Sequence, residues 1–455
     1  KVQFNKGHYL EGKKTINFQS NYSDKAFIRE HLAYQLFRDI GHQYCETELV
    51  RVQLNGAFQG LYTRVENPGN IWCESHNLDK NGSLYKAYDD ARKQSNYEQY
   101  YSKETADETD YSDITAFLNG INDTPYNQIL PFIQSNMDIY SFTGYLTGQA
   151  LINGSDHPAK NYWLYKWPGE NGLWEMFPWD LDLTWGRNYE LNLDVLNDVI
   201  RWDNHILFGT QQYPKCDGPW NRIIDKFLYN SKLKMCYYNR VWYELKHVFT
   251  TERLYPIIEN LRAQLSAEVA LDRAKWGLYN ASSTWNFDNN VNLLKNFIAN
   301  RITYLWAFLT PDSDGDGMPD WWEDAYSIST VPGIRPISKS SYDANGDNDG
   351  DGHNNYSEWI ADTDPTDSRS KFKILSLEIE KESGEIHASI QWSVSPYRDY
   401  IVYYSDDEMG PDMVWNRASE NLRGNPLGIL SYQDTIPGDK QKRFYRVEVV
   451  LNPSM

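Results

Sequence analysis

Residues 155–186 read SDHPAKNYWLYKWPGENGLWEMFPWDLDLTWG, and this stretch decides the fold of the first part of the chain. Asp156 and Asn161 lie five residues apart in a loop. The apolar runs YWLYKW and LWEMF, joined by the turn residues PGENG, predict a β-hairpin. The hairpin leads directly to Asp180, so we expect Asp156, Asn161 and Asp180 to converge.

This order of parts is the one that protein kinases need. In such enzymes a loop aspartate orients the attacking hydroxyl, an asparagine five residues later binds a metal ion, and an aspartate after a hairpin holds the metal that bridges the phosphates. Asp182 shares a face of an extended segment with Asp180 and is a further candidate ligand. The other interpretation stays open: Asp156 and Asn161 cap turns, and the two later aspartates are solvated.

The preceding part of the chain predicts a mixed α/β segment up to Glu66. Ser23 is a candidate N-cap for a helix over DKAFIREHLAYQLFRDIG, residues 24–41, whose apolar residues share one face. LVRVQLNGAFQGLYTRVE, residues 49–66, predicts a hairpin about Asn55-Gly56. Beyond Glu66, residues 67–310 are expected to be mainly helical, interrupted by the hairpin already described.

These motifs resemble the spore-coat CotH kinase family. The runs DKAFIREHLAYQLFRDIG, VQLNGAFQGLYTRVE, SDHPAKNYWLY, FPWDLDLTWG and NFIANRITYL occur in that family's order and cover about residues 1–310. The resemblance implies an atypical two-lobed kinase fold of the α+β class, with lobes at 1–66 and 67–310, that uses ATP with magnesium or manganese. It implies that Asp156 is catalytic, that Asn161 and Asp180 bind metal, and that Glu66 lies near the adenine.

The family also has a basic, glycine-bearing stretch ahead of the first strand, whereas this chain opens at KVQF. We therefore expect the N-lobe to be incomplete at its start. Lys1 and Lys14 are the candidates for the phosphate-contacting lysine, and the alternative for each is an ordinary surface lysine. Glu30, on the predicted helix, would pair with that lysine or face solvent.

An acidic block follows the kinase-like region. The chain has a net charge of −19, and residues 311–370 hold 14 Asp and Glu against 3 Lys and Arg. Residues 312–323 and 347–358 both have the spacing of EF-hand calcium loops, with glycine at the sixth position. The predicted calcium ligands are Asp312, Asp314, Asp316, Asp320, Glu323, Asp343, Asn345, Asp347, Asp349, Asp351, Asn355, Glu358, Asp362 and Asp364.

The acidic block resembles thrombospondin type 3 and dockerin-like calcium repeats. Such sites fill outside cells, where calcium is millimolar, so we expect a secreted or cell-surface protein. The alternative is a solvated acidic linker without calcium. Residues 371–455 alternate apolar and polar positions between turns, which predicts a small antiparallel, sandwich-like β-domain that could contact a cell surface or polysaccharide.

Composition narrows the possible partners. The acidic charge argues against a nucleic-acid partner, and the absence of a long apolar run argues against a membrane span. Two disulfides, Cys45–Cys73 and Cys216–Cys236, are as compatible with the sequence as ordinary thiols are.

Two functions follow from these features. The first is a secreted kinase that phosphorylates Ser or Thr of an extracellular or envelope protein, with the calcium block as a spacer. The second is a pseudokinase or cell-surface scaffold without catalysis. Glycoside hydrolysis is a third and weaker interpretation, because no spacing of carboxylates supports it.

Overall fold

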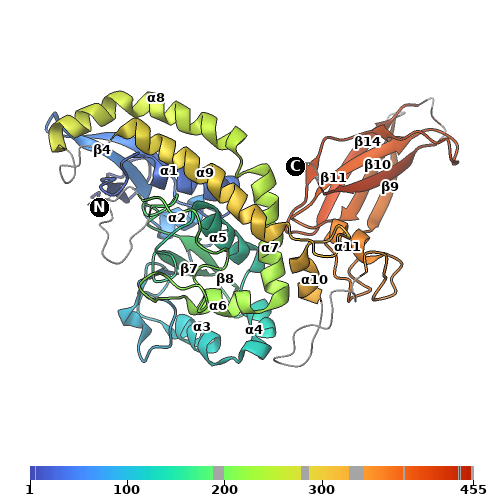
Figure 1. Ribbon diagram of the computed structural model, residues 1–455, viewed down its shortest axis with the longest axis horizontal. Coiled ribbons are helices and arrows are strands. Elements are labelled where there is room, and N and C mark those ends of the chain that lie inside the picture. The colour runs from blue at the N-terminus through green and yellow to red at the C-terminus, as the bar shows by residue number, and fades with distance from the viewer. Residues whose placement is uncertain are drawn as a thin grey trace. The chain divides into compact units, whose positions relative to one another are not determined.

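The computed structural model describes residues 1–5, 7–187, 199–277, 286–326, 343–382, 385–438, 440 and 442–451. Its contacts divide the chain into two compact units, Lys1–Leu309 and Thr310–Met455, and we describe each by itself. Both units are drawn in Figure 1, and the mixed α+β class is confirmed.

The first sheet contains β1 (Val2–Gln3), β2 (Thr15–Gln19), β4 (Ala57–Glu66) and β3 (Thr47–Leu54), antiparallel and in that spatial order. The hairpin β3–β4 is confirmed, and both Asn55 and Gly56 have positive φ, 51° and 80°. A tight two-residue turn with positive φ at both positions matches the twist of the flanking strands.

Helix α1 (Arg29–Asp39) packs against β3. The apolar face predicted for it is buried, at residues 27, 28, 32, 36, 37 and 40. The predicted N-cap is wrong, because Ser23 makes no capping hydrogen bond to the helix. Asp24 holds the start of the helix instead, where its Oδ2 accepts a hydrogen bond of 2.7 Å from the backbone N–H of Arg29.

A second antiparallel sheet contains β6 (Tyr101–Lys103), β5 (Ser83–Ala87), β7 (Tyr162–Lys166) and β8 (Trp174–Pro178), in that order. The hairpin β7–β8 is the one expected from the sequence. Strands β5 and β6 were not expected, so this hairpin is half of a sheet and not an isolated interruption.

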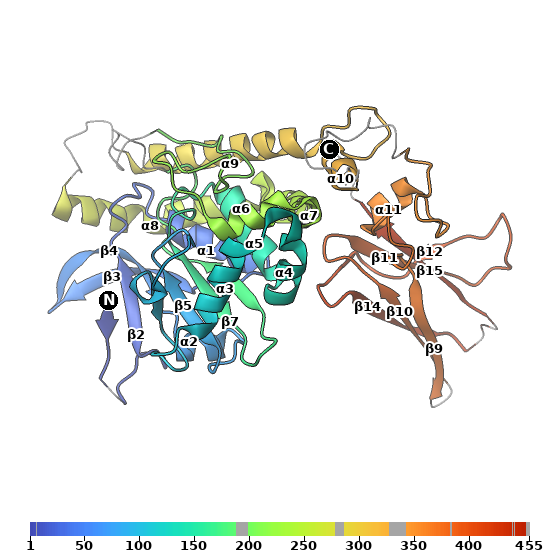
Figure 2. The same ribbon diagram turned by 90° about the horizontal axis from the view of Figure 1, so that it is seen from below.

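Helices make up most of the rest of the first unit. They are α2 (Asn70–Ser75), α3 (Ser112–Asp123), α4 (Ile129–Asn136), α5 (Ile139–Ile152), α6 (Arg222–Tyr229), α7 (Ser231–His247), α8 (Thr251–Trp276) and α9 (Phe287–Leu309). The long helices α8 and α9 lie side by side, and α8 also packs on β4 (Figures 1 and 2). Nearly every residue of α5 is buried, so this helix forms the centre of the unit.

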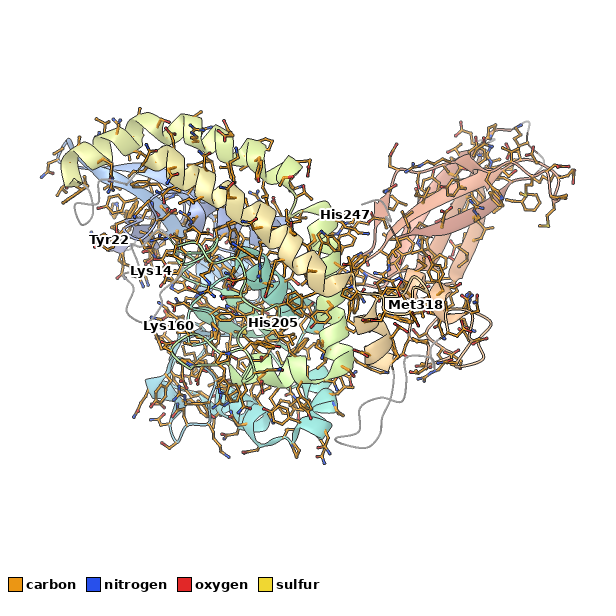
Figure 3. The ribbon with its side chains drawn as sticks, in the orientation of Figure 1. Lys14, Tyr22, Lys160, His205, His247 and Met318 are labelled. Carbon is orange, nitrogen blue, oxygen red and sulfur yellow. The ribbon has the colours of Figure 1, made fainter. Side chains whose placement is uncertain are left out.

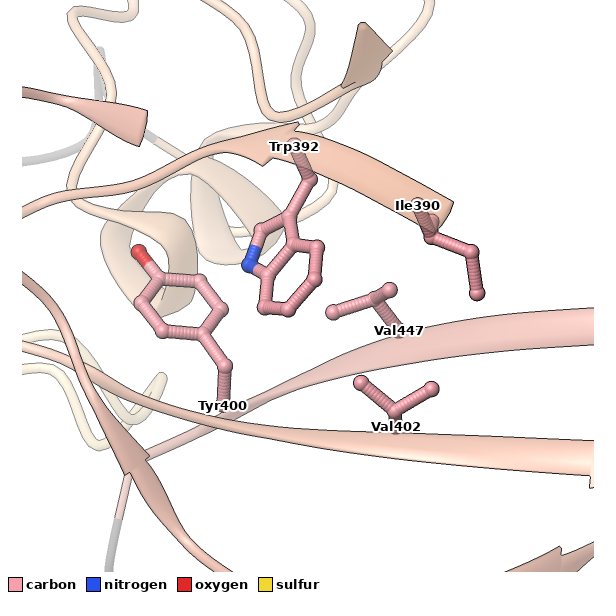
Figure 4. Packing of buried hydrophobic residues seen from close by; sticks show 5 residues of the cluster. All are labelled: Ile390, Trp392, Tyr400, Val402 and Val447. Carbon is pink, nitrogen blue, oxygen red and sulfur yellow. The ribbon is translucent and has the colours of Figure 1, made fainter. Parts of the chain in front are cut away.

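The second unit begins with two short helices, α10 (Asp320–Tyr326) and α11 (Asn355–Ala361). Strands β14 (Ile429–Ile436), β10 (Glu385–Ser393) and β9 (Ile374–Glu382) form one sheet. The other contains β11 (Asp399–Ser405) with β12 (Asn416–Arg417), β13 (Leu422–Arg423) and β15 (Phe444–Val450). The sheets share one apolar core of Ile390, Trp392, Tyr400, Val402 and Val447 (Figure 4).

The four cysteines form no disulfide in this structure. Of the two alternatives for them, the structure therefore agrees with ordinary thiols. Within the described residues no helix is long and apolar enough to cross a membrane.

Candidate functional site

The loop after α5 and the segment after β8 are tied together through their backbones. The N–H and the hydroxyl of Ser155 both donate to the carbonyl of Leu183, at 3.1 and 3.2 Å. The N–H of Trp179 donates to the carbonyl of Asn161 at 3.1 Å. These bonds bring together the two stretches that carry the predicted loop and metal residues, although 24 residues separate Asp156 from Asp180 in the sequence.

Two of the predicted metal ligands have an unusual backbone conformation. Asn161 has φ of 65° and Asp180 has φ of 57°, both in the left-handed region, which asparagine and aspartate adopt more readily than other residues with a Cβ. Both flank the same open end of the hairpin β7–β8, with Asn161 directly before β7 and Asp180 two residues after β8.

The carboxyl groups of this region lie close enough for the charge of one to affect the pKa of another. Burial, followed by the charge of Asp156, raises the pKa of Asp180. Burial and the charge of Asp180 raise the pKa of Asp182 to about 6, against the opposing effect of a hydrogen bond of 2.7 Å from the Ser23 hydroxyl. The structure thus places Asp156, Asp180 and Asp182 in one electrostatic neighbourhood, with Asn161 joined to it through the backbone.

Glu30 belongs to the same neighbourhood. It is 2% exposed, so the alternative of a solvated helix face is wrong. Burial, and then the charges of Asp180 and Asp182, raise its pKa well above the usual range. Within the described chain neither Lys1 nor Lys14 forms an ion pair with it, and the charges that act on it most strongly are those of Asp180, Asp182 and Asp24.

Sequence reasoning missed one residue of this site. The ammonium of Lys215 lies 2.7 Å from Oδ1 of Asp156, and both side chains are largely buried, at 10% and 16% exposure. Burial acts to lower the pKa of Lys215, but the hydrogen bond and charge of Asp156 raise it above its ordinary value. Lys215 stands 59 residues after Asp156 in an irregular segment, so no local pattern connects them.

That segment is fastened to the helical core. Arg301 of α9 donates to the carbonyls of Trp202 and Asn204 at 2.9 and 2.6 Å. The side chain of Asn153 donates to the carbonyl of Arg201 at 2.7 Å. The stretch before α6 is therefore held over the loop of Asp156, which also carries Lys160, labelled in Figure 3.

Three of the four predicted nucleotide residues line a cavity of the first unit, and Glu30 does not. Lys1, Lys14 (labelled in Figure 3) and Glu66 are among the residues around a cavity of about 600 Å³ beside the connection from β4 to α2. The lysine that pairs with Glu66 is Lys13, at 2.8 Å. Asp156 and Asp180 are not among the residues around this cavity. Lys86 connects the two features, because burial lowers its pKa while the charges of Asp180 and of Lys1, which lines the cavity, also act on it.

The two acidic loops have the same local geometry. In each, the ligand oxygens of three aspartates, at 312, 314 and 316 or at 347, 349 and 351, lie within 4.8 Å of one another. In the first loop, Asp312 accepts hydrogen bonds from the N–H groups of Gly315 and Gly317, at 2.8 and 2.9 Å. Asp347 accepts the equivalent bonds from Gly350 and Gly352, at 2.8 and 2.9 Å.

Oxygen atoms without a hydrogen-bond partner are buried beside the second loop. Glu358 and Asn355 are 1% and 0% exposed, and within the described chain neither Glu358 Oε2 nor Asn355 Oδ1 has a hydrogen bond. Burial raises the pKa of Glu358 to about 7, and the charges of Asp349 and Asp351 act in the same direction. Buried oxygens without donors, next to carboxylates, are what a bound cation would satisfy.

The other predicted calcium residues have varied surroundings. Glu323 is buried, and Asp320 accepts hydrogen bonds from the N–H and hydroxyl of Ser313. Before the second loop, Asp343 accepts a hydrogen bond of 3.0 Å from the N–H of Asn345. Asp362 accepts the hydroxyl of Ser395, and Asp364 accepts the N–H of Thr366 at 3.0 Å. The last two lie after α11 and are not members of either triad.

The two loops pack as a pair. Trp321 and Trp322 of α10 contact Trp359 of α11 edge to face, with ring centroids 5.4 and 5.9 Å apart. The backbone of Ala344 hydrogen-bonds Asp316, so the segment before the second loop supports a carboxylate of the first. Arg398 joins the pair to the β-sheets by donating to the carbonyls of Trp359 and Ile360 at 2.8 Å.

Comparison with known proteins found relatives for the first unit. A family model described as CotH kinase protein matches residues 1–305. "Inner spore coat protein H" of Bacillus subtilis (strain 168) is 24% identical over an alignment of 314 residues, and the match covers 67% of this chain and 81% of that protein. The family match ends before the first acidic loop, so it covers the carboxylate neighbourhood but neither calcium-type loop.

Proposed function

Because the chain belongs to the CotH kinase protein family, we propose that it is a kinase that transfers the γ-phosphoryl group of ATP to a serine or threonine of another protein. The observation that supports this most directly is that backbone hydrogen bonds join the loop of Asp156 to the segment of Asp180, so that the charge of Asp156 acts on Asp180. Asp156 would accept the proton of the acceptor hydroxyl, as the loop aspartate does in other kinases. Lys215, at 2.7 Å, would hold that carboxylate in place.

The residues of the site fit a divalent cation. Asn161, Asp180 and Asp182 offer the hard oxygen donors that magnesium and manganese prefer, and they would hold the ion. A bound ion would neutralise the charge of the nucleotide phosphates. Lys1, Lys14 and Glu66 would face the nucleotide from the cavity of about 600 Å³, whose size is in the range of small-molecule sites.

Transfer of radiolabelled phosphate from ATP to the chain itself and to envelope extracts tests the proposal. The wild-type chain should label a protein, and Asp156→Asn should not. Nucleotide with magnesium should raise the melting temperature of both, because Asp156 acts on the hydroxyl and not on the metal. Absence of labelling together with absence of thermal stabilisation would contradict the kinase assignment.

A non-catalytic scaffold is the second candidate, and one observation favours it. In the described chain Glu30 pairs with neither Lys1 nor Lys14, whereas active kinases pair a helix glutamate with the phosphate-contacting lysine. A scaffold would be stabilised by nucleotide weakly or not at all, and it would label no substrate. The two measurements above therefore separate the candidates.

We further propose that residues 312–323 and 347–358 each bind one calcium ion and act as a structural spacer. The aspartate triads and the buried oxygens of Glu358 and Asn355 support this proposal. Sites of this type fill at extracellular calcium concentrations, so we propose a secreted or cell-surface location and an extracellular or envelope substrate. Calorimetric titration should find two sites in the wild-type chain and one in Glu358→Gln.

A further inference from the structure

Strand β9 (Ile374–Glu382) is the end strand of its sheet. It pairs with β10 along one side, and among the described strands none pairs with its other side. Figure 2 shows it at the edge of the β-sheet region, beyond β10. A nine-residue edge presents a row of backbone donors and acceptors to any extended chain that approaches it, and proteins usually shorten or block such edges.

The inner face of β9 ends in Lys381, but its middle carries the apolar residues Leu377 and Ile379, which are uncovered. Leu377 and Ile379 stand opposite Ile390 and Ala388 of β10, which are both 1% exposed. Residues directly opposite one another in an antiparallel pair point to the same face. Leu377 and Ile379 are nevertheless 50% and 59% exposed. The second sheet therefore covers β10 but leaves an apolar stripe along β9.

The outer face of β9 is acidic. Glu378 and Glu380 are exposed and stand opposite Ser389 and His387. Neither glutamate has an ion pair or a side-chain hydrogen bond with any other described residue. Antiparallel pairing with a second copy of this strand in the registers centred on Glu378 or Ile379 would place two carboxylates directly opposite each other, and like charges in that position destabilise a sheet.

We propose that the edge of β9 binds an extended protein segment in which apolar side chains alternate with lysine or arginine. The segment would add a fourth strand to the sheet β14-β10-β9. Its apolar side chains would cover Leu377 and Ile379, and its basic side chains would stand beside Glu378 and Glu380. This inference depends neither on the kinase assignment nor on calcium.

Fluorescence anisotropy of labelled peptides with the full chain tests the proposal. The probes are KVKVKVKVK, EVEVEVEVE and the block peptide KKKKKVVVV, which has the composition of the first without its alternation. The first probe should bind one to one and more tightly than the other two. Ile379→Asp should weaken it about tenfold, because it removes a cross-strand apolar contact and buries a charge. The matched control Leu427→Asp, at an 86% exposed loop position, should bind as the wild type does.

Charge reversal provides a second variant that should not disturb folding. The side chain of Glu378 is exposed. Glu378→Lys should weaken binding of KVKVKVKVK and strengthen binding of EVEVEVEVE. Equal binding of the alternating and block peptides, or unchanged affinity in both Ile379→Asp and Glu378→Lys, would overturn the proposal. Dimerisation of the wild-type chain in sedimentation, lost in Ile379→Asp, would overturn it in favour of a second copy.

Discussion

Replacing Lys215 by methionine is the sharpest test of the carboxylate neighbourhood. The change removes the ammonium 2.7 Å from Asp156 Oδ1 while keeping most of the apolar stem. We expect transfer activity to fall about a hundredfold, the size of effect seen when one preorganised charge partner is removed from an active site. Lys215→Arg keeps the charge and should recover part of the activity.

The loss of stability can be bounded from the burial of the pair. Removing one partner of a fully buried ion pair costs about 3–5 kcal/mol, whereas an exposed pair contributes about 0–1 kcal/mol. At 10% and 16% exposure the pair of Lys215 and Asp156 lies between these limits, and we expect a loss of about 1–3 kcal/mol. Each kcal/mol should lower the melting temperature by roughly 2–4 °C.

The chain offers a matched control for this substitution. Lys93 pairs with Asp123 at 2.6 Å, but both side chains are more than half exposed, at 56% and 57%. Lys93→Met should change neither the melting temperature nor the transfer rate. Thermal melts and initial rates of phosphate transfer would be measured on both variants. Wild-type transfer by Lys215→Met, or equal melting of the two variants, would refute the role assigned to Lys215.

Three further predictions concern other parts of the chain. Asp180→Ala should abolish the magnesium-dependent gain in melting temperature that nucleotide produces. Asp156→Ala should retain that gain but lose phosphate transfer, and transfer by Asp156→Ala would show that the roles are wrongly assigned. Removal of calcium by a chelator should make the chain sensitive to protease at Val331–Ser341, a segment outside the described residues. The reason is that carboxylates a few ångströms apart repel by about 1 kcal/mol or more per pair without cations. An unchanged cleavage pattern would count against structural calcium. Gly60→Ala should lower the free energy of unfolding by about 1–3 kcal/mol, because its φ is 148° and a Cβ would lie 2.8 Å from a carboxylate oxygen. The half-buried Gly69, with nothing within 4 Å of a Cβ, is the control and should tolerate alanine.

Local patterns predicted the elements that local forces determine. The hairpin β3–β4 followed from Asn55-Gly56, because a tight turn needs residues that tolerate positive φ. The buried face of α1 and the hairpin β7–β8 followed from periodicity, because each periodicity matches the geometry of one element. Strands β5 and β6 were missed because they are short and gain most of their stability from pairing with a distant strand.

The sequence by itself determined which residues could carry charge chemistry: Asp156, Asn161 and Asp180 in kinase order, and two twelve-residue acidic loops. The sequence could not predict which side chains lie next to these residues in the folded chain. The contact of Lys215 with Asp156, the burial of Glu30 against Asp180, and the uncovered face of β9 depend on segments far apart in the chain. Burial and ion pairing act through space, so their effects on a side chain depend on packing that no local pattern encodes.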